Sequence, residues 1–203
     1  MRKITVGIVD YGVGNHASVR HTLNELGMRC RTSDDPAVLD GCDMLLLPGV
    51  GAFRPAIEAL RARALDAYLL GWAERARPLL GICLGMQLLA EASHEAGFTP
   101  GLGLVPGEVV GLPPPHWHIG WNTIEQVQSD PLFLASDGQA FYFNHSYAYR
   151  GPIEYQVCRT IAGAEFASVI RKERILGVQF HPEKSQAAGR GLLKQLIVGL
   201  CDA

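Results

Sequence analysis

Apolar residues in this chain form short, nearly continuous runs separated by longer stretches with helical spacing. Residues 4–9 are rich in β-branched side chains and alternate little, which is typical of a strand buried on both faces. Residues 43–47 form a second short run that ends at Pro48-Gly49. Between the two runs, residues 15–26 carry apolar side chains at helical spacing, and Gly27 follows as a stop signal. We predict a strand in each run and a helix between them.

The same alternation continues to the middle of the chain. Residues 53–70 have helical spacing, as does the stretch around 72–75, and Pro78 opens another strand-like apolar run. Strands that alternate with helices indicate a mainly parallel sheet with helices on both faces. From residue 104 to residue 169 the sequence changes to short strands, prolines and aromatic residues, which suggests antiparallel additions.

The last part of the chain completes the predicted fold. Residues 166–170 and 175–180 predict a hairpin around Lys172-Glu173, and a final helix is expected over about residues 188–200. No internal repeat, low-complexity tract or interdomain linker is visible in the sequence. We therefore expect one α/β domain over residues 1–203, with a mainly parallel central sheet flanked by helices and added antiparallel strands.

Composition narrows the class of protein. The 203 residues, of which 48% are hydrophobic, can form one sizeable core. A formal net charge of -2 offers no basic surface for nucleic acid or an anionic membrane, so neither is expected as a partner. Five cysteines form an odd set without a C-x-x-C pair, which favours reduced thiols and a cytoplasmic protein. The first residues lack the long apolar region of a signal peptide, and no apolar run reaches transmembrane length.

The clearest chemical signal is the pentapeptide Gly81-Ile82-Cys83-Leu84-Gly85. It follows a strand-like apolar run and precedes residues that favour helix. Glycines on both sides of Cys83 permit a sharp turn, as in the G-x-S-x-G elbow of serine hydrolases. A thiol at a helix N-terminus is favoured as thiolate, with a pKa below its reference of about 8.5. For the motif alone, a buried structural cysteine remains the alternative.

A matching signal lies near the end of the chain, in His181-Pro182-Glu183. The preceding residues predict a strand that Pro182 ends. In extended chain, residues two apart point to the same side, so His181 and Glu183 can lie side by side. An imidazole held by a carboxylate can accept the proton of a thiol. A solvated polar turn explains the tripeptide taken alone, whereas its combination with the cysteine elbow favours catalysis.

These motifs occur together in a known family. The sequence resembles the class I, or triad-type, glutamine amidotransferases, and among them the glutaminase subunits of imidazole glycerol phosphate synthases of histidine biosynthesis. The elbow and His181-Pro182-Glu183 carry the first resemblance. The segments that carry the second are Asp10-Tyr11-Gly12-Val13-Gly14-Asn15, Leu47-Pro48-Gly49-Val50-Gly51-Ala52-Phe53, Gly101-Leu102-Gly103-Leu104, His118-Ile119-Gly120-Trp121-Asn122, Phe141-Tyr142-Phe143-Asn144-His145-Ser146-Tyr147 and Lys184-Ser185.

The resemblance implies a flavodoxin-like fold and hydrolysis of L-glutamine to glutamate and ammonia without a cofactor. Cys83 would be the nucleophile, His181 its acid and base, and Glu183 the residue that orients the imidazole. These roles follow from the positions at which this sequence matches the family.

Stabilising the oxyanion of such a reaction needs hydrogen-bond donors. The amide of Leu84, directly after the nucleophile, is placed to supply one. We expect the second from the glycine-rich loop that contains Val50 and Gly51. Because glycines let this loop turn an amide towards or away from the site, we interpret Val50 as a switch that a partner and its ligand make productive. An ordinary strand-to-helix turn is the alternative.

Further residues are candidates for binding glutamine. Gln87 lies one helical turn beyond the nucleophile and could bond the amino-acid end of the substrate, unless it simply faces solvent. Glu95 could hold the substrate ammonium or be an ordinary surface acid. His145, Ser146 and Tyr147 match the family segment whose backbone binds the substrate carboxylate, although a histidine such as His145 is more often packed in a core.

The resemblance also implies a partner, the cyclase subunit, which is a (β/α)₈ barrel and forms a heterodimer with the glutaminase. The cyclase uses the ammonia to make imidazole glycerol phosphate and an aminoimidazole carboxamide nucleotide. The residues implied at the partner interface are Asn15, Trp121, Asn122, Tyr142 and Lys184. From its residue type alone, Tyr142 is as easily a core aromatic as part of a pocket wall.

His116 and His118 have no ligand set around them in the sequence, so no metal is expected.

Three other readings stay open. The unusual Pro113-Pro114-Pro115-His116-Trp117 segment in the presumed docking region keeps a paralogous glutaminase possible, for example one that feeds sugar amidation in surface-polysaccharide synthesis. A cysteine peptidase or chaperone-like protein would share the elbow but has no need of Gln87 together with His181-Pro182-Glu183. A binding module that lost activity is disfavoured by the intact set of catalytic residues.

Overall fold

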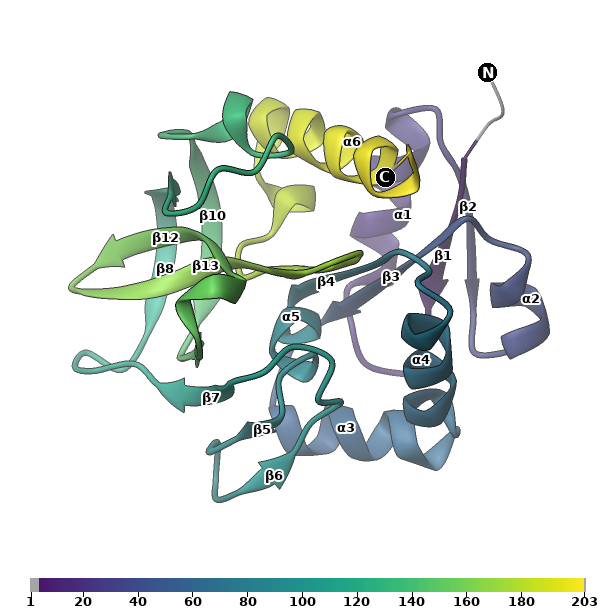
Figure 1. The fold of residues 1–203 in the computed structure, drawn as a ribbon, viewed down its shortest axis with the longest axis horizontal. Coiled ribbons are helices and arrows are strands. Elements are labelled where there is room, and N and C mark those ends of the chain that lie inside the picture. Colours follow the sequence, from purple (N-terminus) through teal and green to yellow (C-terminus); the bar gives the residue numbers. More distant parts are fainter. Residues whose placement is uncertain (1–3, 203) are drawn as a thin grey trace.

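An eight-stranded sheet with the order β2-β1-β3-β4-β14-β13-β12-β9 forms the centre of the structure (Figure 1). The computed structural model describes residues 4–202 of the predicted 1–203 domain. The first five strands in this order, β2, β1, β3, β4 and β14, run parallel. β13, β12 and β9 extend the sheet by antiparallel pairing. In spatial order the strands are β2 (Arg29–Ser33), β1 (Thr5–Val9), β3 (Met44–Gly49), β4 (Leu79–Cys83), β14 (Ile175–Val178), β13 (Ala164–Lys172), β12 (Gln156–Ala162) and β9 (Glu125–Gln126).

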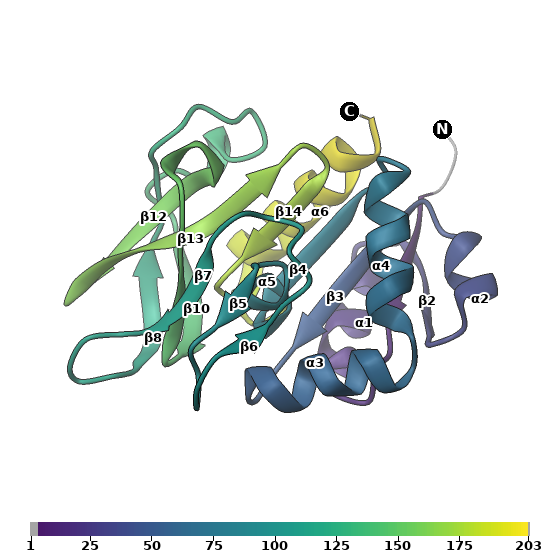
Figure 2. The same cartoon turned by 60° about the horizontal axis from the view of Figure 1, so that its bottom comes forward.

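Helices cover both faces of the parallel strands (Figures 1 and 2). One face carries α1 (His16–Glu25) and α6 (Gln186–Asp202), and the other carries α3 (Phe53–Ala62), α4 (Leu65–Glu74) and α5 (Leu84–Leu88). Alternate strand residues enter the two layers, so Val6 and Ile8 pack towards α1 and α6 whereas Leu45 and Leu47 pack towards α3 and α4. Burial of both faces explains the continuous apolar runs, and the predicted α/β fold class is confirmed.

The antiparallel half adds two smaller sheets. β10 (Ala140–His145) pairs with β8 (His118–Thr123), while β11 (Tyr147–Arg150), β7 (Glu108–Gly111), β5 (Ala92–Ser93) and β6 (Thr99–Pro100) form a second sheet. β13 and β14 pair antiparallel, which confirms the hairpin predicted around Lys172-Glu173. The short 3-10 helices are η1 (Leu134–Ser136), η2 (Ile153–Tyr155) and η3 (Pro182–Lys184).

Two predicted helices are interrupted or shorter in the structure. The single helix predicted over residues 53–70 is divided into α3 and α4, because Ala64 adopts a left-handed conformation with φ 54°. The helix expected to continue after Cys83 ends at Leu88. The carbonyls of residues 88–91 accept hydrogen bonds from the backbone of residues 101–105, so they are not available for another helical turn.

Other differences concern elements with weak sequence signals. The prediction omitted β2, an edge strand with exposed or half-exposed residues, and α2 (Pro36–Asp40), a single turn capped by Asp35. β14 ends at Val178 and does not reach residue 180. α6 begins at Gln186 and extends to Asp202, so it is longer than the predicted range of 188–200.

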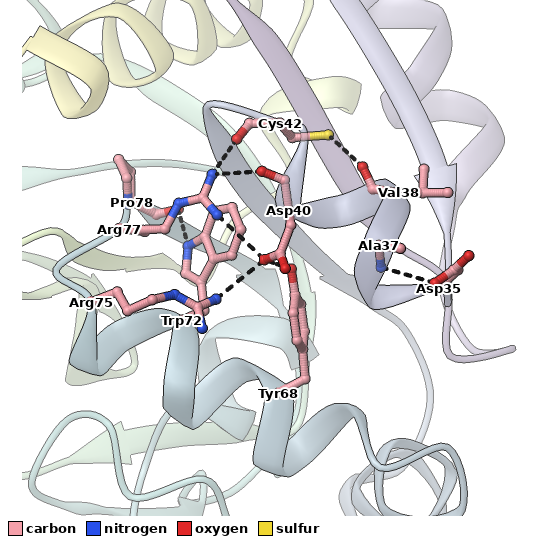
Figure 3. Close-up of polar contacts among 10 residues, drawn as sticks. All are labelled: Asp35, Ala37, Val38, Asp40, Cys42, Tyr68, Trp72, Arg75, Arg77 and Pro78. Carbon is pink, nitrogen blue, oxygen red and sulfur yellow. Dashed lines mark hydrogen bonds and ion pairs between the residues drawn. The ribbon is translucent and has the colours of Figure 1, made fainter.

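A polar cluster joins α2 to α4 at the amino end of the parallel strands (Figure 3). Asp40 accepts hydrogen bonds from the hydroxyl of Tyr68 at 3.0 Å and from the guanidinium of Arg77 at 3.4 Å. Arg77 also stacks on Trp72, with 3.4 Å from the guanidinium carbon to the ring centroid. The indole N–H of Trp72 donates to the carbonyl of Pro78, which lies just before β4. The cluster therefore fixes the end of β4 opposite Cys83.

Candidate active site

Cys83 stands at a strained elbow between β4 and α5. Its backbone has φ 56° and ψ -112°, a combination that residues other than glycine rarely adopt. The turn is packed so tightly that a Cβ at Gly85 would lie 1.8 Å from the carbonyl oxygen of Leu47, and one at Gly81 would lie 2.6 Å from the carbonyl oxygen of Gly85. Because α5 has only five residues, the helix dipole that was expected to act at its N-terminus is small.

The loop after β3 lies beside the elbow, because Gly49 and the elbow cysteine are paired in the sheet. The next residues, Val50 and Gly51, line the same cavity as the sulfur. The buried hydroxyl of Tyr11 donates to the carbonyl of Pro48 at 2.8 Å and holds the start of the loop. Gly51 has φ +94°, which favours glycine. The loop predicted to supply an oxyanion donor is thus adjacent to the predicted nucleophile.

His181 follows β14 and is held through its backbone on both sides. Its N–H donates to the carbonyl of Tyr142 at 2.8 Å, and its carbonyl accepts from the hydroxyl of Ser185 at 2.6 Å. Its Nδ1 lies 2.8 Å from Oε1 of Glu183, whose side chain is 1% exposed. The two side chains meet across the 3-10 turn η3, and not along an extended strand as the sequence analysis assumed.

The imidazole of His181 interacts with both predicted partners. Burial alone would lower the pKa of His181, but hydrogen bonds to Cys83 and Glu183 and their negative charges raise it to about 9. Because Nδ1 of His181 interacts with Glu183, Nε2 is the ring nitrogen that can exchange a proton with the sulfur of Cys83. Transfer of a proton between this imidazole nitrogen and the sulfur can therefore generate the nucleophile.

These residues border a cavity of about 340 Å³, a size suited to a small ligand. Of the predicted catalytic residues, Cys83 and His181 line it, and Glu183 is buried behind His181. The predicted oxyanion and substrate residues all line it, as does one residue predicted at the partner interface. These cavity-lining residues are Leu84, Val50, Gly51, Gln87, Glu95, His145, Ser146, Tyr147 and Lys184.

The carbonyl of Tyr147 organises the wall of the cavity. It accepts from Nε2 of Gln87 at 2.8 Å and from Nδ1 of His145 at 2.9 Å. Nε2 of His145 therefore accepts from Nδ1 of His118, 3.1 Å away. Burial lowers the pKa of His145 to about 4 and also lowers that of His118. Both histidines are neutral at physiological pH, which makes His145 a fixed wall and not a proton donor.

Glu95 connects the cavity to the start of α3. Its Oε2 accepts from the backbone N–H of Phe53 at 2.8 Å, which caps a helix whose own N-cap, Ala52, provides no side-chain bond. The carboxylate is half-buried and is not the plain surface acid that the sequence left as an alternative. Its position beside the cavity leaves it within the predicted substrate site.

A sequence model of class I glutamine amidotransferases matches residues 7–198. The chain belongs to the class I glutamine amidotransferase family. The imidazole glycerol phosphate synthase subunit HisH of Symbiobacterium thermophilum is 45% identical over 199 residues, which cover 96% of this chain and 94% of the relative. The subunit of the same name from Lacticaseibacillus casei is 44% identical over 192 residues, covering 93% and 92%.

A solved structure shows the same fold. The crystal structure of a glutamine amidotransferase from Thermotoga maritima aligns with a TM-score of 0.72 at 16% sequence identity, covering 100% of both chains. Membership of the amidotransferase family agrees with the resemblance seen in the sequence and excludes the peptidase or chaperone reading. The names of the relatives favour the histidine-pathway glutaminase over the paralogous enzyme of polysaccharide synthesis.

The remaining residues predicted at the partner interface lie outside the cavity of this amidotransferase. Trp121 is 49% exposed and contacts Tyr142 edge-on, with 6.2 Å between ring centroids. Asn122 donates to the carbonyl of Ile161 at 3.0 Å and so ties β8 to β12. Asn15 caps α1 by accepting from the N–H of Ser18. Asn122 and Asn15 therefore have local structural contacts besides any role in docking.

Sequence reasoning missed two residues near the sulfur. Gln179 is fully buried, and its Nε2 lies 3.8 Å from Sγ of Cys83. A polar residue inside the apolar run before His181 was the available signal. Tyr11 was quoted only as part of a family segment, although it anchors the loop before Val50. The backbone carbonyl of Asn144, 3.9 Å from the sulfur, could not be found from residue type.

Three findings concern features expected to be absent. Within residues 4–202, no group of three or more His, Cys, Asp or Glu side chains could hold a metal ion. In the same part of the chain, none of the five cysteines forms a disulfide. None of the described helices has both the length and the apolar character that crossing a membrane requires.

Proposed function

We propose that this chain is the glutaminase subunit of an imidazole glycerol phosphate synthase and acts through Cys83, His181 and Glu183. The observation that carries the proposal is the convergence of these side chains at one cavity, in a chain about 45% identical over most of its length to subunits of that name. The function is to release ammonia from L-glutamine for a synthase reaction in histidine biosynthesis.

In the first half of the reaction the thiolate of Cys83 attacks the carboxamide carbon of glutamine. The C–N bond breaks as His181 transfers its proton to the leaving nitrogen, which departs as ammonia and leaves a thioester. The raised pKa of His181 supports this step, because it keeps the imidazole protonated and able to act as the acid while the sulfur is a thiolate. Glu183 stabilises the imidazolium and keeps its ring in place.

The second half of the reaction needs His181 as a base. Once the sulfur is part of a thioester, its negative charge no longer raises the pKa of the imidazole. The neutral His181 then takes a proton from water, which attacks the thioester carbon. Cleavage of the C–S bond gives glutamate and restores the thiolate and the imidazolium, while the carboxylic acid loses its own proton to solvent.

Backbone amides stabilise the oxyanion in both halves. Leu84 supplies one N–H, and the loop of Val50 and Gly51 supplies the other when a partner and its ligand are bound. The hydrogen bond from Tyr11 anchors this loop on one side, and Gly51 at φ +94° gives it freedom on the other. Loss of one such donor typically costs about 2.7–4 kcal/mol of barrier, enough to separate a resting from an active state.

The cavity walls bind the amino-acid end of glutamine. Both amide hydrogens of Gln87 are engaged, by the carbonyl of Tyr147 and by the side-chain oxygen of Gln179. The oxygen of Gln87 is therefore the atom that meets the substrate, and together with Glu95 it suits the α-ammonium group. Backbone groups of Ser146 and Tyr147, which lie next to Gln87, hold the carboxylate.

The partner is the cyclase subunit, a (β/α)₈ barrel that forms a heterodimer with this chain. Ammonia is protonated and loses its nucleophilicity in water, so it has to pass directly to a second active site. A docking surface around Trp121 and Asn122 fits this need, because Trp121 contacts Tyr142 and the ring of Tyr142 lies 6.4 Å from that of His181. Lys184, which is also predicted at this interface, lines the cavity.

The function is tested by glutamate release with and without the histidine-pathway cyclase and its nucleotide ligand. We expect strong stimulation by the complex, no turnover by Cys83→Ala, and normal turnover by the matched variant Cys30→Ala, whose thiol lies outside the cavity. Failure to bind this cyclase, with ammonia delivered to another synthase, would replace the assignment with the paralogous glutaminase.

The switch is tested separately by two substitutions of Val50. Val50→Pro removes the backbone N–H, whereas Val50→Ala keeps it. We expect stimulated turnover to fall by about 10²–10³-fold in the proline variant and to remain near normal in the alanine variant. Equal glutamine turnover with and without the liganded cyclase would refute the switch but not the glutaminase chemistry.

A further inference from the structure

The side chain of Gln179 is buried completely beside the reacting sulfur. It lies between the end of β14 and His181, and its own backbone N–H is bonded to the carbonyl of Ser168. A buried carboxamide requires partners at both ends. Its Oε1 accepts from Nε2 of Gln87 at 3.1 Å, and its Nε2 lies 3.8 Å from Sγ of Cys83.

The direction of this carboxamide is fixed by the order of donors and acceptors around it. The carbonyl of Tyr147 can only accept, so Gln87 must turn its NH₂ group towards it. The second hydrogen of the same NH₂ group then points to Gln179, which must present its oxygen. The NH₂ group of Gln179 is consequently left facing the sulfur of Cys83.

A donor in this position favours one protonation state of the sulfur. The neighbouring carbonyl of Asn144, 3.9 Å away, can bond only a thiol that still carries its hydrogen. The amide of Gln179 bonds more strongly to a negatively charged sulfur than to a neutral one. Gln179 therefore shifts the balance between these two neighbours towards the thiolate.

We propose that Gln179 is a further catalytic residue that donates a hydrogen bond to the thiolate of Cys83 and thereby keeps the nucleophile ionised and oriented. The inference deepens the proposed function, since it takes Cys83 as the nucleophile. Gln179 also connects Gln87, which we place in the glutamine-binding part of the cavity, to the sulfur, because Gln87 holds the carboxamide that donates to Cys83.

The test is the pH dependence of alkylation of Cys83 by iodoacetamide, measured by peptide mass spectrometry on the 203-residue chain without glutamine or a partner. The ionisable groups that face the sulfur or the cavity are His181, Glu183, Tyr11, His145, Glu95 and Lys184. All of these groups are retained in the Gln179 variants, so differences between the variants report the side chain at position 179.

Gln179→Met keeps the length of the side chain and removes the donor. We expect its alkylation midpoint to move up by about one pH unit, which is a tenfold slower reaction below the midpoint, equivalent to about 1.4 kcal/mol. Gln179→Glu keeps the acceptor for Gln87 and places an oxygen towards the sulfur. It should raise the midpoint further, and it serves as the second variant if the methionine protein does not fold.

Two controls separate this effect from a general loss of structure. Thr160→Val removes another buried hydrogen bond, from the threonine hydroxyl to the carbonyl of Thr123, and should leave the midpoint of Cys83 unchanged. Cys30, which is half-buried outside the cavity, reports within each sample and should not change.

A folded Gln179→Met or Gln179→Glu protein with the wild-type alkylation profile would overturn the inference. Failure of the proposed function would show elsewhere, as absent glutamine turnover in the cyclase complex. The thiol measurement needs neither glutamine nor the cyclase, so the two failures are distinguishable.

Discussion

His145 should make the protein lose stability in acid, by an amount that follows from its surroundings. The imidazole is 7% exposed, donates to the carbonyl of Tyr147 and accepts from His118. Protonation would leave a positive charge in a poorly solvated site. Burial, the largest cause, therefore lowers the pKa of His145 to about 4, although the hydrogen bond to the carbonyl of Tyr147 acts in the opposite direction.

The sign and size follow from proton linkage. Between pH 6.5, the ordinary pKa of histidine, and pH 4, the unfolded chain binds a proton at residue 145 that the folded chain does not bind. Stability is therefore fully present above pH 6.5 and is lost as pH falls towards 4. At pH 5, proton binding to residue 145 favours the unfolded chain by a factor of about 30, which lowers the free energy of unfolding by about 2 kcal/mol. Below pH 4 the loss approaches about 3.4 kcal/mol.

The assay is urea unfolding followed by tryptophan fluorescence at pH 7.5 and pH 5. His145→Asn retains a donor where Nδ1 lies but cannot titrate, so wild type should lose about 2 kcal/mol more than this variant between the two pH values. His21→Asn is the matched control, because the side chain of His21 is 75% exposed, and it should behave as wild type. Identical pH dependence of wild type and His145→Asn would refute the reasoning.

Three other changes give distinct outcomes. Glu183→Gln should lower stimulated glutamine turnover by about 10²–10⁴-fold, since an amide cannot hold the catalytic imidazole in its charged form; near-normal turnover would contradict the proposed triad. Tyr11→Phe leaves the carbonyl of Pro48 without its donor, so the free energy of unfolding should fall by about 1–3 kcal/mol in urea titration, and an unchanged value would argue against the anchor. Gly85→Ala should prevent correct folding, whereas Gly191→Ala, which meets open space, should raise the melting temperature slightly; similar melting temperatures for the two variants would mean that the elbow is not tightly packed.

Much of the fold was predictable where residues interact locally or where burial on both faces leaves a continuous apolar run. This holds for β1, β3 and β4 and for the hairpin of β13 and β14. Prediction failed where distant segments compete for the backbone. α5 stops at Leu88 because residues 101–105 bind its carbonyls, and β2 lacks an apolar pattern because it is an edge strand.

The candidate site shows the same division. Cys83, His181 and Glu183 could be named from residue type and spacing, because their chemistry is intrinsic and their glycine and proline neighbours mark a turn. The proximity of His181 and Glu183 was also predicted, but from the wrong backbone conformation, since they meet through a 3-10 turn that the sequence analysis read as extended chain. Gln179 escaped notice because a glutamine has no chemistry of its own until a donor and an acceptor are placed around it.

The sequence by itself thus determined the kind of reaction and the alternation of strands and helices that builds the parallel part of the sheet. Only the tertiary structure decided which atoms face the sulfur, which histidine is charged and which is neutral. The physical reason is that pKa values and hydrogen-bond directions depend on burial and on neighbours from distant parts of the chain. His181 beside Glu183 and His145 beside His118 are the same residue type with opposite shifts.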